Sequence, residues 1–420
     1  MMSDGNGATI EQLVARQRPG FTLEQPFYTD REVFDFDLER IVMRQWLFVD
    51  HVSRIPDAGD YILYKIASEE IIVVRDAAGE IHAHFNVCRH RGSRICLEAA
   101  GNVKSLTCPY HAWTYALDGR LTTARRMPDG FNPDDYPLHR CHLRVYQGMM
   151  FVNLAEGEPT DFDVIARDLD PFVVPHGIPR TKIVHVERYP TDGNWKLAVE
   201  NFRECYHCPS AHPEYTRVNA YVRANDAEQD GYAETIEAWN DKTAAMGHIV
   251  GSVHNNTELP EQPHGAFRQP IREGYLTLSK GGKQVGPLIG DFEQFDGGEM
   301  MAVFGPLFYV YAANDHVCLF RFTPMTPTHT EVVLTWLVHE DAVEGVDYTV
   351  DPLKWMWHVT TVQDTRIIGN NQAGVTSRRY SPGRYSERER FTAAFTRWYL
   401  EQLGGAAVSE DKYLETLCID

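Results

Sequence analysis

The sequence lacks long apolar segments and contains little cysteine and little positive charge. No apolar run approaches the roughly 20 residues that cross a membrane, and residues 1–10 lack the apolar core of a secretory signal. Eight cysteines in 420 residues are too sparse for a disulfide scaffold. Lys and Arg number 40 against 59 Asp and Glu, and a net charge of −19 argues against nucleic-acid binding, which needs a basic surface. We therefore expect a cytoplasmic protein that binds neither a membrane nor nucleic acid.

The distribution of strand signals predicts two domains in an α+β fold. At 43% hydrophobic residues the chain can form two substantial cores. From Gln45 to Leu154 short strand-like runs alternate with turns, which is typical of a small antiparallel domain. Helical segments follow, and then a second strand region with a Pro/Thr-rich turn at Thr323–Thr330. The predicted strands are Tyr61–Tyr64, Ile71–Val74, Met149–Val152, Leu307–Ala312, Val317–Phe322 and Glu331–Val338.

Two helices are predicted near the C-terminus. Asp351-Pro352 offers an N-cap followed by a proline at the first helical position, and a helical pattern continues to about Gln372. Ser386 and Glu389 form a capping-box pattern before the second helix, which should end at Gly404-Gly405. Its aromatic stripe, Phe391, Phe395 and Trp398, fits a core or a subunit interface better than a cofactor site.

The first chemical motif is Cys88-Arg89-His90 followed by Cys108-Pro109-Tyr110-His111. Each half supplies one thiolate and one imidazole, which suits a Rieske [2Fe–2S] cluster with two Cys on one iron and two His on the other. A Cys2His2 zinc site is the alternative, but its usual spacing puts both Cys in one half and both His in the other. Asp118-Gly119 would turn a hairpin beside the second half.

The remaining cysteines show no comparable pairing. We interpret them as ordinary buried or partly buried thiols. They are Cys96, Cys141, Cys205, Cys208, Cys318 and Cys418.

The second motif contains His207 and His212, five residues apart. On a regular helix this step would separate them by about 140°, so a shared metal requires the helix to bend or end between them, for which Pro209 offers a reason. Asp364, in the middle of the helix predicted to follow Asp351, is the candidate third ligand. A mid-helix carboxylate alone is more often solvated, but two His and one carboxylate form the facial triad of non-haem Fe(II) oxygenases. One centre that accepts electrons and one that can activate dioxygen together indicate an enzyme.

The two motifs resemble those of the large subunit of Rieske non-haem iron oxygenases, and the resemblance extends from about Trp46 to Leu403. It implies an N-terminal helical segment (1–44) packing on the catalytic domain, a Rieske domain (45–155), and a helix-grip catalytic domain (156–420) with helices covering an antiparallel sheet. It also implies a homotrimer in which Glu204 bridges the iron of one subunit to a cluster histidine of its neighbour. Many aromatic-ring dioxygenases of the family carry Asp at that position. The implied ligands are Cys88, His90, Cys108 and His111 for the cluster and His207, His212 and Asp364 for the iron.

Within this family the segment Asn201–Cys208 and the residues around Asn371 resemble the branch of glycine betaine monooxygenase and stachydrine demethylase. That branch implies hydroxylation of an N-methyl group of a quaternary ammonium compound and release of formaldehyde. No nucleotide-binding glycine motif follows a strand, so NAD(P)H electrons should come through a separate flavin/[2Fe–2S] reductase or a ferredoxin. A quaternary nitrogen needs an aromatic cage, for which the available residues are Trp239, Phe304, Phe308, Tyr309, Tyr311 and Trp336.

Two other functions stay open at this point. A purely apolar pocket would favour a hydroxylase or dioxygenase of an aromatic or alicyclic substrate. A Rieske electron carrier without its own catalysis would need only the first domain, whereas about 265 residues follow it here.

Overall fold

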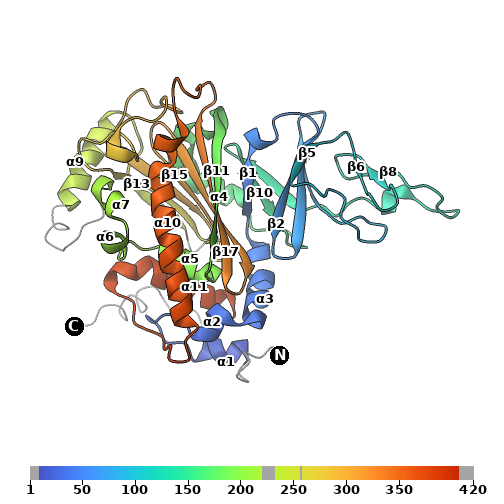
Figure 1. The fold of residues 1–420 in the computed structure, drawn as a ribbon, viewed down its shortest axis with the longest axis horizontal. Helices are drawn as coiled ribbons and strands as arrows, with labels where there is room; N and C mark the ends of the chain where they lie inside the picture. The colour runs from blue at the N-terminus through green and yellow to red at the C-terminus, as the bar shows by residue number, and fades with distance from the viewer. Residues whose placement is uncertain (1–8, 220–231, 256–257, 406–420) are drawn as a thin grey trace. The chain divides into compact units, whose positions relative to one another are not determined.

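The computed structural model describes residues 9–219, 232–255 and 258–405, and it divides into two compact units (Figure 1). Trp46–Pro159 form the smaller unit. The N-terminal segment up to Gln45 joins the chain from Thr160 onward in the larger one.

Three antiparallel sheets make up the smaller unit, with strand orders β1-β10-β9, β4-β3-β2-β5 and β6-β7-β8. The central strand β3 pairs with β2 on one side and β4 on the other, and its run Ile71–Val74 is fully buried, as β-branched residues in a central strand favour. The bounds are β1 (Leu47–His51), β2 (Asp60–Ile66), β3 (Glu69–Arg75), β4 (Ile81–Phe85), β5 (Ala100–Asn102), β6 (Leu106–Thr107), β7 (Thr114–Tyr115), β8 (Leu121–Thr123), β9 (His142–Tyr146) and β10 (Met149–Asn153), with 3-10 turns η2 (Val52–Arg54) and η3 (Pro133–Asp135).

One antiparallel sheet of seven strands forms the centre of the larger unit, in the order β11-β17-β16-β15-β14-β13-β12. With the three sheets of the smaller unit, it confirms the predicted α+β fold with antiparallel sheets. Its strands are β11 (Thr181–Thr191), β12 (Ser252–Asn255), β13 (His264–Pro270), β14 (Gly298–Phe304), β15 (Phe308–Ala312), β16 (Val317–Thr326) and β17 (His329–His339).

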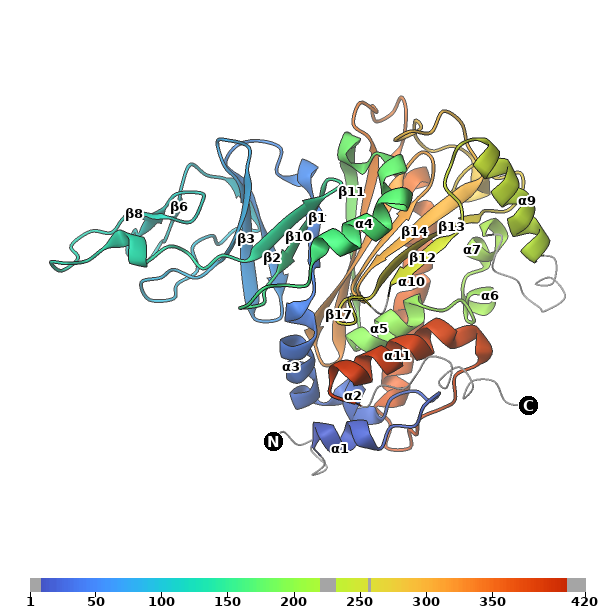
Figure 2. The ribbon, with the colours of Figure 1, turned by 180° about the vertical axis from the view of Figure 1, so that it is seen from behind.

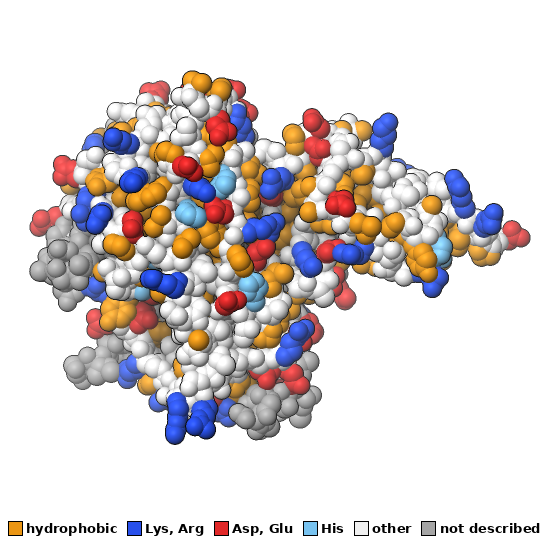
Figure 3. Space-filling view, viewed as in Figure 1, with side chains coloured by type: hydrophobic (Ala, Val, Ile, Leu, Met, Phe, Trp, Pro, Cys, Tyr) orange, Lys and Arg blue, Asp and Glu red, His pale blue; other side chains and the backbone are white. Residues whose placement is uncertain are grey.

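Helices cover both faces of this sheet. The long helix α10 crosses one face (Figure 1), and α4 crosses the other (Figure 2). On the face that carries α10, acidic and basic side chains are interspersed over the surface (Figure 3). The helices are α1 (Ile10–Ala15), α2 (Gln25–Thr29), α3 (Arg31–Arg40), α4 (Phe162–Val173), α5 (Trp195–Phe202), α6 (Cys208–Ala211), α7 (Pro213–Val218), α9 (Tyr232–Ala245), α10 (Val350–Val375) and α11 (Arg390–Gln402), with 3-10 turns η1 (Val42–Arg44), η4 (Val174–His176), η5 (Ile178–Arg180), η6 (Lys280–Gly282) and η7 (Glu387–Glu389).

The structure corrects two predicted boundaries. Helix α10 begins at Val350 after the N-cap Thr349, so Asp351 lies in its first turn and is not the cap. Strands β16 and β17 extend through most of the predicted turn Thr323–Thr330, because Thr323 pairs with Glu331 and Thr326 with His329. Threonine suits an extended strand, which explains the longer pairing. The capping box of Ser386 and Glu389 is confirmed.

Candidate active site

Two loops of the same design carry the first motif. The amide of Cys88 donates to Ser93 O and the amide of Gly92 to Cys88 O. In the second loop the amide of Cys108 donates to Trp113 O and the amide of Ala112 to Cys108 O. Gly92 and Ala112 both have positive φ, 76° and 56°, which turns each loop back on itself. The repeated pattern brings the two halves of the motif together.

Each loop buries its cysteine and exposes its histidine. Cys88 and Cys108 are 3% and 2% exposed, whereas His90 and His111 lie at the surface with ring centroids 4.7 Å apart. The Tyr115 hydroxyl lies 3.3 Å from Cys88 Sγ. Two buried thiols beside two paired, exposed imidazoles fit the donor set of a Rieske cluster, whose two irons differ in their ligands.

The second motif converges on one point in the larger unit. His207 Nε2 lies 3.1 Å from His212 Nε2, and Asp364 Oδ1 lies 3.0 Å from His212 Nε2 and 3.5 Å from His207 Nε2. Ligand atoms bonded to one ion at about 2.0–2.2 Å are separated by roughly these distances. Two imidazoles and one carboxylate therefore fit the facial donor set of a non-haem Fe(II) site.

Helix ends place the two histidines. His207 precedes the short helix α6, and His212 lies between α6 and α7 with non-helical φ and ψ of −124° and 67°. The chain does end a helix between them, as predicted. The role expected of Pro209 is wrong, however, because Pro209 lies in the first turn of α6, where proline is tolerated.

The second ring nitrogen of each histidine is already held by an acceptor. His207 Nδ1 donates to Glu204 Oε1 at 2.6 Å, and His212 Nδ1 donates to Gln363 Oε1 at 2.8 Å. Gln363 Nε2 in turn donates to Glu214 Oε2 at 2.9 Å. A proton on Nδ1 leaves Nε2 as the free lone pair, so these contacts select the tautomer that can bind a metal.

Glu204 is not on a helix, because α5 ends at Phe202. Helical spacing therefore does not bring it to His207. Its second oxygen, Oε2, accepts from the backbone amides of Tyr206 and His207. The turn formed by residues 204–207 positions the carboxylate.

The pKa shifts of His207 and Asp364 reflect the negative charge of the site. Burial lowers the pKa of His207, but hydrogen bonds to Asp364 and Glu204 outweigh it and raise the pKa to about 9. Burial opposes ionisation of Asp364, yet its hydrogen bonds to both imidazoles hold its pKa below the usual range. Such a site attracts a cation, as a metal centre requires.

One cysteine interpretation is wrong. Cys205 and Cys208 form a disulfide three residues apart in sequence, because the turn before α6 brings their Cα atoms to 4.9 Å. The Cys208 sulfur lies close to the His207 and His212 nitrogens but is bonded to Cys205 and is not a free thiolate. Cys96, Cys141 and Cys318 are free and buried, as expected, and Cys418 lies outside the described residues.

A buried polar network fixes α5, from whose end the second motif begins. Asp37 of α3 accepts hydrogen bonds from Lys196 Nζ, from Trp195 Nε1 at 3.2 Å and from the Tyr399 hydroxyl at 2.7 Å. Asp37 and Lys196 are both 0% exposed, so the buried charge of each must be compensated by the other. The network ties α5 to the N-terminal and C-terminal helices.

Helix α10, which carries Asp364, is tied to the other end of α5. Gln372 Oε1 accepts from the amide of Asn194, the N-cap of α5, at 2.8 Å. A Cβ on the preceding Gly193 would lie 2.4 Å from Ile368 Cγ2, so glycine permits the close approach of α10. Helix α10, which supplies Asp364, is thus held against α5, the helix that precedes the two-histidine segment.

Comparison with known proteins agrees with both motifs. A profile described as the Rieske [2Fe-2S] domain matches residues 45–146, and one described as the catalytic domain of ring-hydroxylating alpha subunits matches residues 180–405. The chain is 35% identical to the glycine betaine monooxygenase oxygenase subunit of Pseudomonas aeruginosa, over 94% of this chain and 92% of the relative. For the corresponding subunit of Chromohalobacter salexigens the identity is 36%, over 94% and 88%. The chain belongs to the Rieske non-haem iron oxygenase alpha subunits.

A solved structure gives the same fold. The quaternary ammonium Rieske monooxygenase CntA in complex with L-carnitine matches with a TM-score of 0.66 at 22% identity, over 95% of this chain and 99% of that chain. The protein is therefore an oxidoreductase of the Rieske oxygenase family, with a Rieske [2Fe–2S] domain and a non-haem iron catalytic domain. Among the described residues, none of the helices is both long and apolar enough to cross a bilayer.

An aromatic cluster of this Rieske oxygenase adjoins the candidate iron ligands. Trp357, two helical turns before Asp364 on α10, has its ring centroid 4.4 Å from that of Tyr311, 5.2 Å from that of Phe320 and 5.8 Å from that of Tyr215. Phe202, at the end of α5, contacts Tyr311 and Phe320 in turn, at 5.9 Å and 5.1 Å. We call Phe202, Tyr215, Tyr311, Phe320 and Trp357 the aromatic cluster.

Strand register sorts the six predicted cage residues. Tyr311 pairs with Met301 and Cys318, and Cys318 pairs with Trp336. Paired residues share a sheet face, so Tyr309, Tyr311 and Trp336 lie on the face under α5 and α10. Phe304 and Phe308 lie on the opposite face by the same alternation. Trp239 also lies on this opposite face, because it packs over Gly298 of β14.

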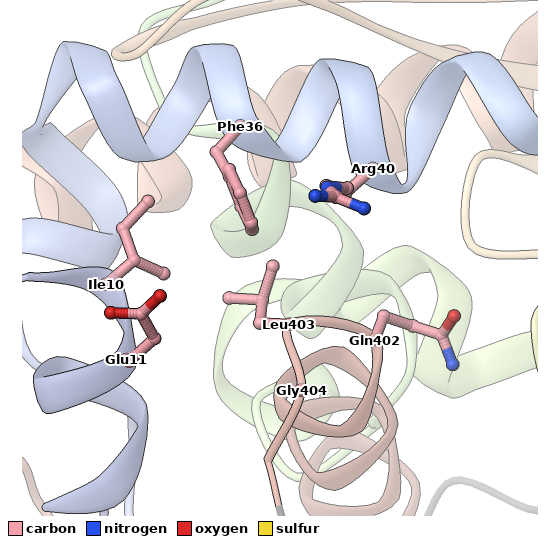
Figure 4. Close-up of a pocket in the computed structure, with 7 residues that line it drawn as sticks. All are labelled: Ile10, Glu11, Phe36, Arg40, Gln402, Leu403 and Gly404. Carbon is pink, nitrogen blue, oxygen red and sulfur yellow. The ribbon is translucent and has the colours of Figure 1, made fainter. Parts of the chain in front are cut away.

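Two surface hollows lie elsewhere on the larger unit. One, of about 450 Å³, is lined by residues of α1 and α3 and by the end of α11, with Phe36 and Arg40 facing Leu403 (Figure 4). The other, of about 390 Å³, lies beside Arg268 and Phe292. Neither contains a predicted site residue.

Proposed function

We propose that the protein is the terminal oxygenase component of a system that hydroxylates an N-methyl group of a betaine-type quaternary ammonium compound. The observation that carries this proposal is the aromatic cluster beside the convergent His207, His212 and Asp364. Relatives of 35% and 36% identity, matched over nearly their whole length, are named as glycine betaine monooxygenase oxygenase subunits. The combination favours a cationic substrate over a purely apolar one.

Aromatic faces are suited to this substrate class. A quaternary nitrogen has no N–H to donate, so it is held by cation–π attraction and by shape. Trp357 is 3% exposed and Tyr311 is partly buried. The planes of their rings meet at an angle of 49°. The two rings place aromatic surface beside the proposed iron ligands.

The proposed ligands divide between two centres. Cys88, His90, Cys108 and His111 would hold the Rieske cluster, and His207, His212 and Asp364 would hold Fe(II). When bound, the cluster supplies single electrons and the iron supplies a site for dioxygen activation. Glu204 and Gln363 keep both proposed iron-ligand imidazoles in the required tautomer.

The reaction balances with one dioxygen and two electrons. One oxygen atom enters a C–H bond of the N-methyl group, and the other leaves as water with two protons and two electrons. The N-hydroxymethyl product then releases formaldehyde and its hydroxyl proton as the C–N bond breaks, and the nitrogen keeps the electron pair. NAD(P)H supplies the electrons through a separate flavin/[2Fe–2S] reductase or a ferredoxin.

Assembly as a homotrimer belongs to the same proposal. Glu204 would accept a hydrogen bond from a cluster histidine of a neighbouring subunit and join the two centres through His207. Its side chain is 12% exposed, and its Oε1 already contacts His207. A head-to-tail ring would place one such junction at each interface.

Formaldehyde release tests the proposal. The protein, loaded with both metals, would be mixed with a reductase and NADH and offered glycine betaine, carnitine, stachydrine and choline. We expect formaldehyde from at least one of them, in proportion to NADH consumed. Indole and biphenyl serve as comparison substrates. Hydroxylation of these rings without formaldehyde from any quaternary compound would assign the protein to aromatic oxidation.

A further inference from the structure

A fully buried carboxyl group on the iron-site face of the sheet has no charged partner among the residues that the structure describes. Glu299 of β14 is 0% exposed. Its Oε1 accepts from Asn219 Nδ2 and from Gln269 Nε2, both at 2.6 Å. Its Oε2 is buried and has no hydrogen-bond partner among the described residues. Among the described residues, the only groups that donate hydrogen bonds to this carboxyl group are two neutral amides.

Glu299 belongs to the same surroundings as the aromatic cluster. It lies two residues before Met301 on β14, and Met301 pairs with Tyr311, so the side chains of Glu299 and Tyr311 share a sheet face. Tyr311 feels the charges of both Glu299 and Asp364. Asn219, which donates to Glu299, also donates to the Tyr215 hydroxyl at 2.9 Å.

Helix α7 connects this carboxyl group to the iron site. His212 precedes its first residue, Tyr215 lies within it, and Asn219 follows its last. The helix thus spans from a proposed iron ligand, past a member of the aromatic cluster, to the amide that holds Glu299. One short rigid element orients all three.

The bonding of Glu299 is incomplete in either protonation state. If it is ionised, Oε2 is a buried anionic oxygen without a donor, which is costly. If it is neutral, the described residues show no hydrogen bond that uses its acid proton. Burial raises the pKa of Glu299 to about 7, and the two amide hydrogen bonds only partly oppose that shift. A cation arriving from outside would match the carboxylate, whereas the two amides orient it without cancelling its charge.

We propose that Glu299 is the anionic recognition group for the quaternary ammonium head of the substrate, acting beside Tyr311 and Trp357 of the aromatic cluster. This inference rests on the proposed function and adds a specificity residue to it. Aromatic faces alone attract a cation modestly. A buried carboxylate adds an attraction that a neutral molecule of the same shape cannot share.

A pair of probes that differ only in charge tests this role. Glycine betaine and 3,3-dimethylbutanoate have the same shape, with N⁺ replaced by carbon. Calorimetric titration of the metal-loaded protein without oxygen would give both dissociation constants. We expect wild type to bind glycine betaine more tightly. Glu299→Gln keeps the size and an acceptor for Asn219 and Gln269, and it should weaken betaine binding at least about tenfold while leaving the isostere unchanged.

Two further variants control for structure. Glu331→Gln makes the same chemical change on β17 of the same sheet, at a residue whose carboxylate accepts a hydrogen bond from Arg188 at 2.6 Å. This variant should bind both probes as wild type does. Glu299→Asp keeps the charge and should retain a preference for the cation. The Asp variant also carries the test if Glu299→Gln fails to fold.

Each other outcome overturns the role of Glu299. Unchanged cation preference in Glu299→Gln, in a protein whose wild type releases formaldehyde from betaine, refutes the inference and leaves the proposed function standing. Equal weakening of both probes assigns Glu299 to the fold alone. Wild type that binds neither probe and releases no formaldehyde from any quaternary compound refutes the proposed function, and the inference with it.

Discussion

Replacing Gln363 with Leu should weaken iron binding without touching a proposed ligand. Gln363 Oε1 accepts from His212 Nδ1 at 2.8 Å, and the His212 side chain is only 2% exposed. Water therefore cannot take the place of the lost acceptor. In the metal-free protein the ring can move its proton to the other nitrogen, but a metal on Nε2 requires the proton on Nδ1. The cost consequently falls on the metal-bound state.

The magnitude follows from this geometry. An unsatisfied buried N–H costs about 1–3 kcal/mol, which corresponds to roughly 5- to 150-fold in an equilibrium constant. Loss of an acceptor that orients a metal-binding histidine typically costs about 10- to 100-fold in affinity. We expect Gln363→Leu to weaken Fe(II) binding within that range.

Competition against a chelator of known affinity, without oxygen, measures the effect. Asn371→Leu is the matched control, because it makes the same kind of change at an exposed position of the same helix. It should leave iron affinity unchanged, and both variants should keep the Rieske spectrum. Equal iron affinity in Gln363→Leu and wild type would refute the claim that Gln363 orients His212.

Three further predictions concern the two centres. His207→Ala or Asp364→Ala should abolish turnover and keep the visible spectrum of the cluster, which lies in the other unit; near-normal activity would remove that residue from the site. Tyr115→Phe should lower the cluster potential by about 40 mV, the one-electron equivalent of a hydrogen bond worth about 1 kcal/mol, because the hydroxyl lies 3.3 Å from Cys88 Sγ; an unshifted voltammogram contradicts this. Glu204→Gln should keep both metals and leave the proposed trimer intact but slow single-turnover oxidation of the reduced cluster at least about tenfold; an unchanged rate excludes bridging.

Local spacing made the two metal motifs predictable from sequence. The Cys-x-His and Cys-x-x-His halves need only a tight loop each, and the structure supplies two loops of one design. The meeting of His207 and His212 also follows from short-range geometry. Asp364 is 152 residues away from His212, and its candidacy depended on pairing a helix with the two-histidine motif.

Features that depend on a few backbone angles were harder to predict from the sequence. The disulfide of Cys205 and Cys208 depends on the turn between α5 and α6. The Cys-x-x-Cys spacing was the available signal for it. The same turn, which no helical pattern predicts, gives Glu204 its contact with His207. The first turn of α10 begins at Val350 without a side-chain cap, which capping rules cannot locate.

Which residues form the aromatic cluster depends on how the strands pair. A one-residue shift moves every side chain to the other face, so sequence alone could not separate Tyr311 from Phe308. Phe202, Tyr215 and Phe320 were not predicted. The alternation of side chains along Val317–Phe322 was the available signal for Phe320. It places Phe320 on the same sheet face as Cys318, which pairs with Tyr311. Glu299 gave no signal, because its burial and its amide partners emerge only in the folded chain.

The central claim is that this oxygenase oxidises an N-methyl group of a quaternary ammonium compound. Glycine betaine with three deuterated methyl groups tests it most directly, in the presence of reductase, NADH and dioxygen. The account predicts dideuterated formaldehyde and dimethylglycine that keeps two deuterated methyl groups, formed one to one with each other and with NADH consumed in coupled turnover. Oxygen consumption with no deuterated formaldehyde, from this or any other quaternary methyl compound, would contradict it.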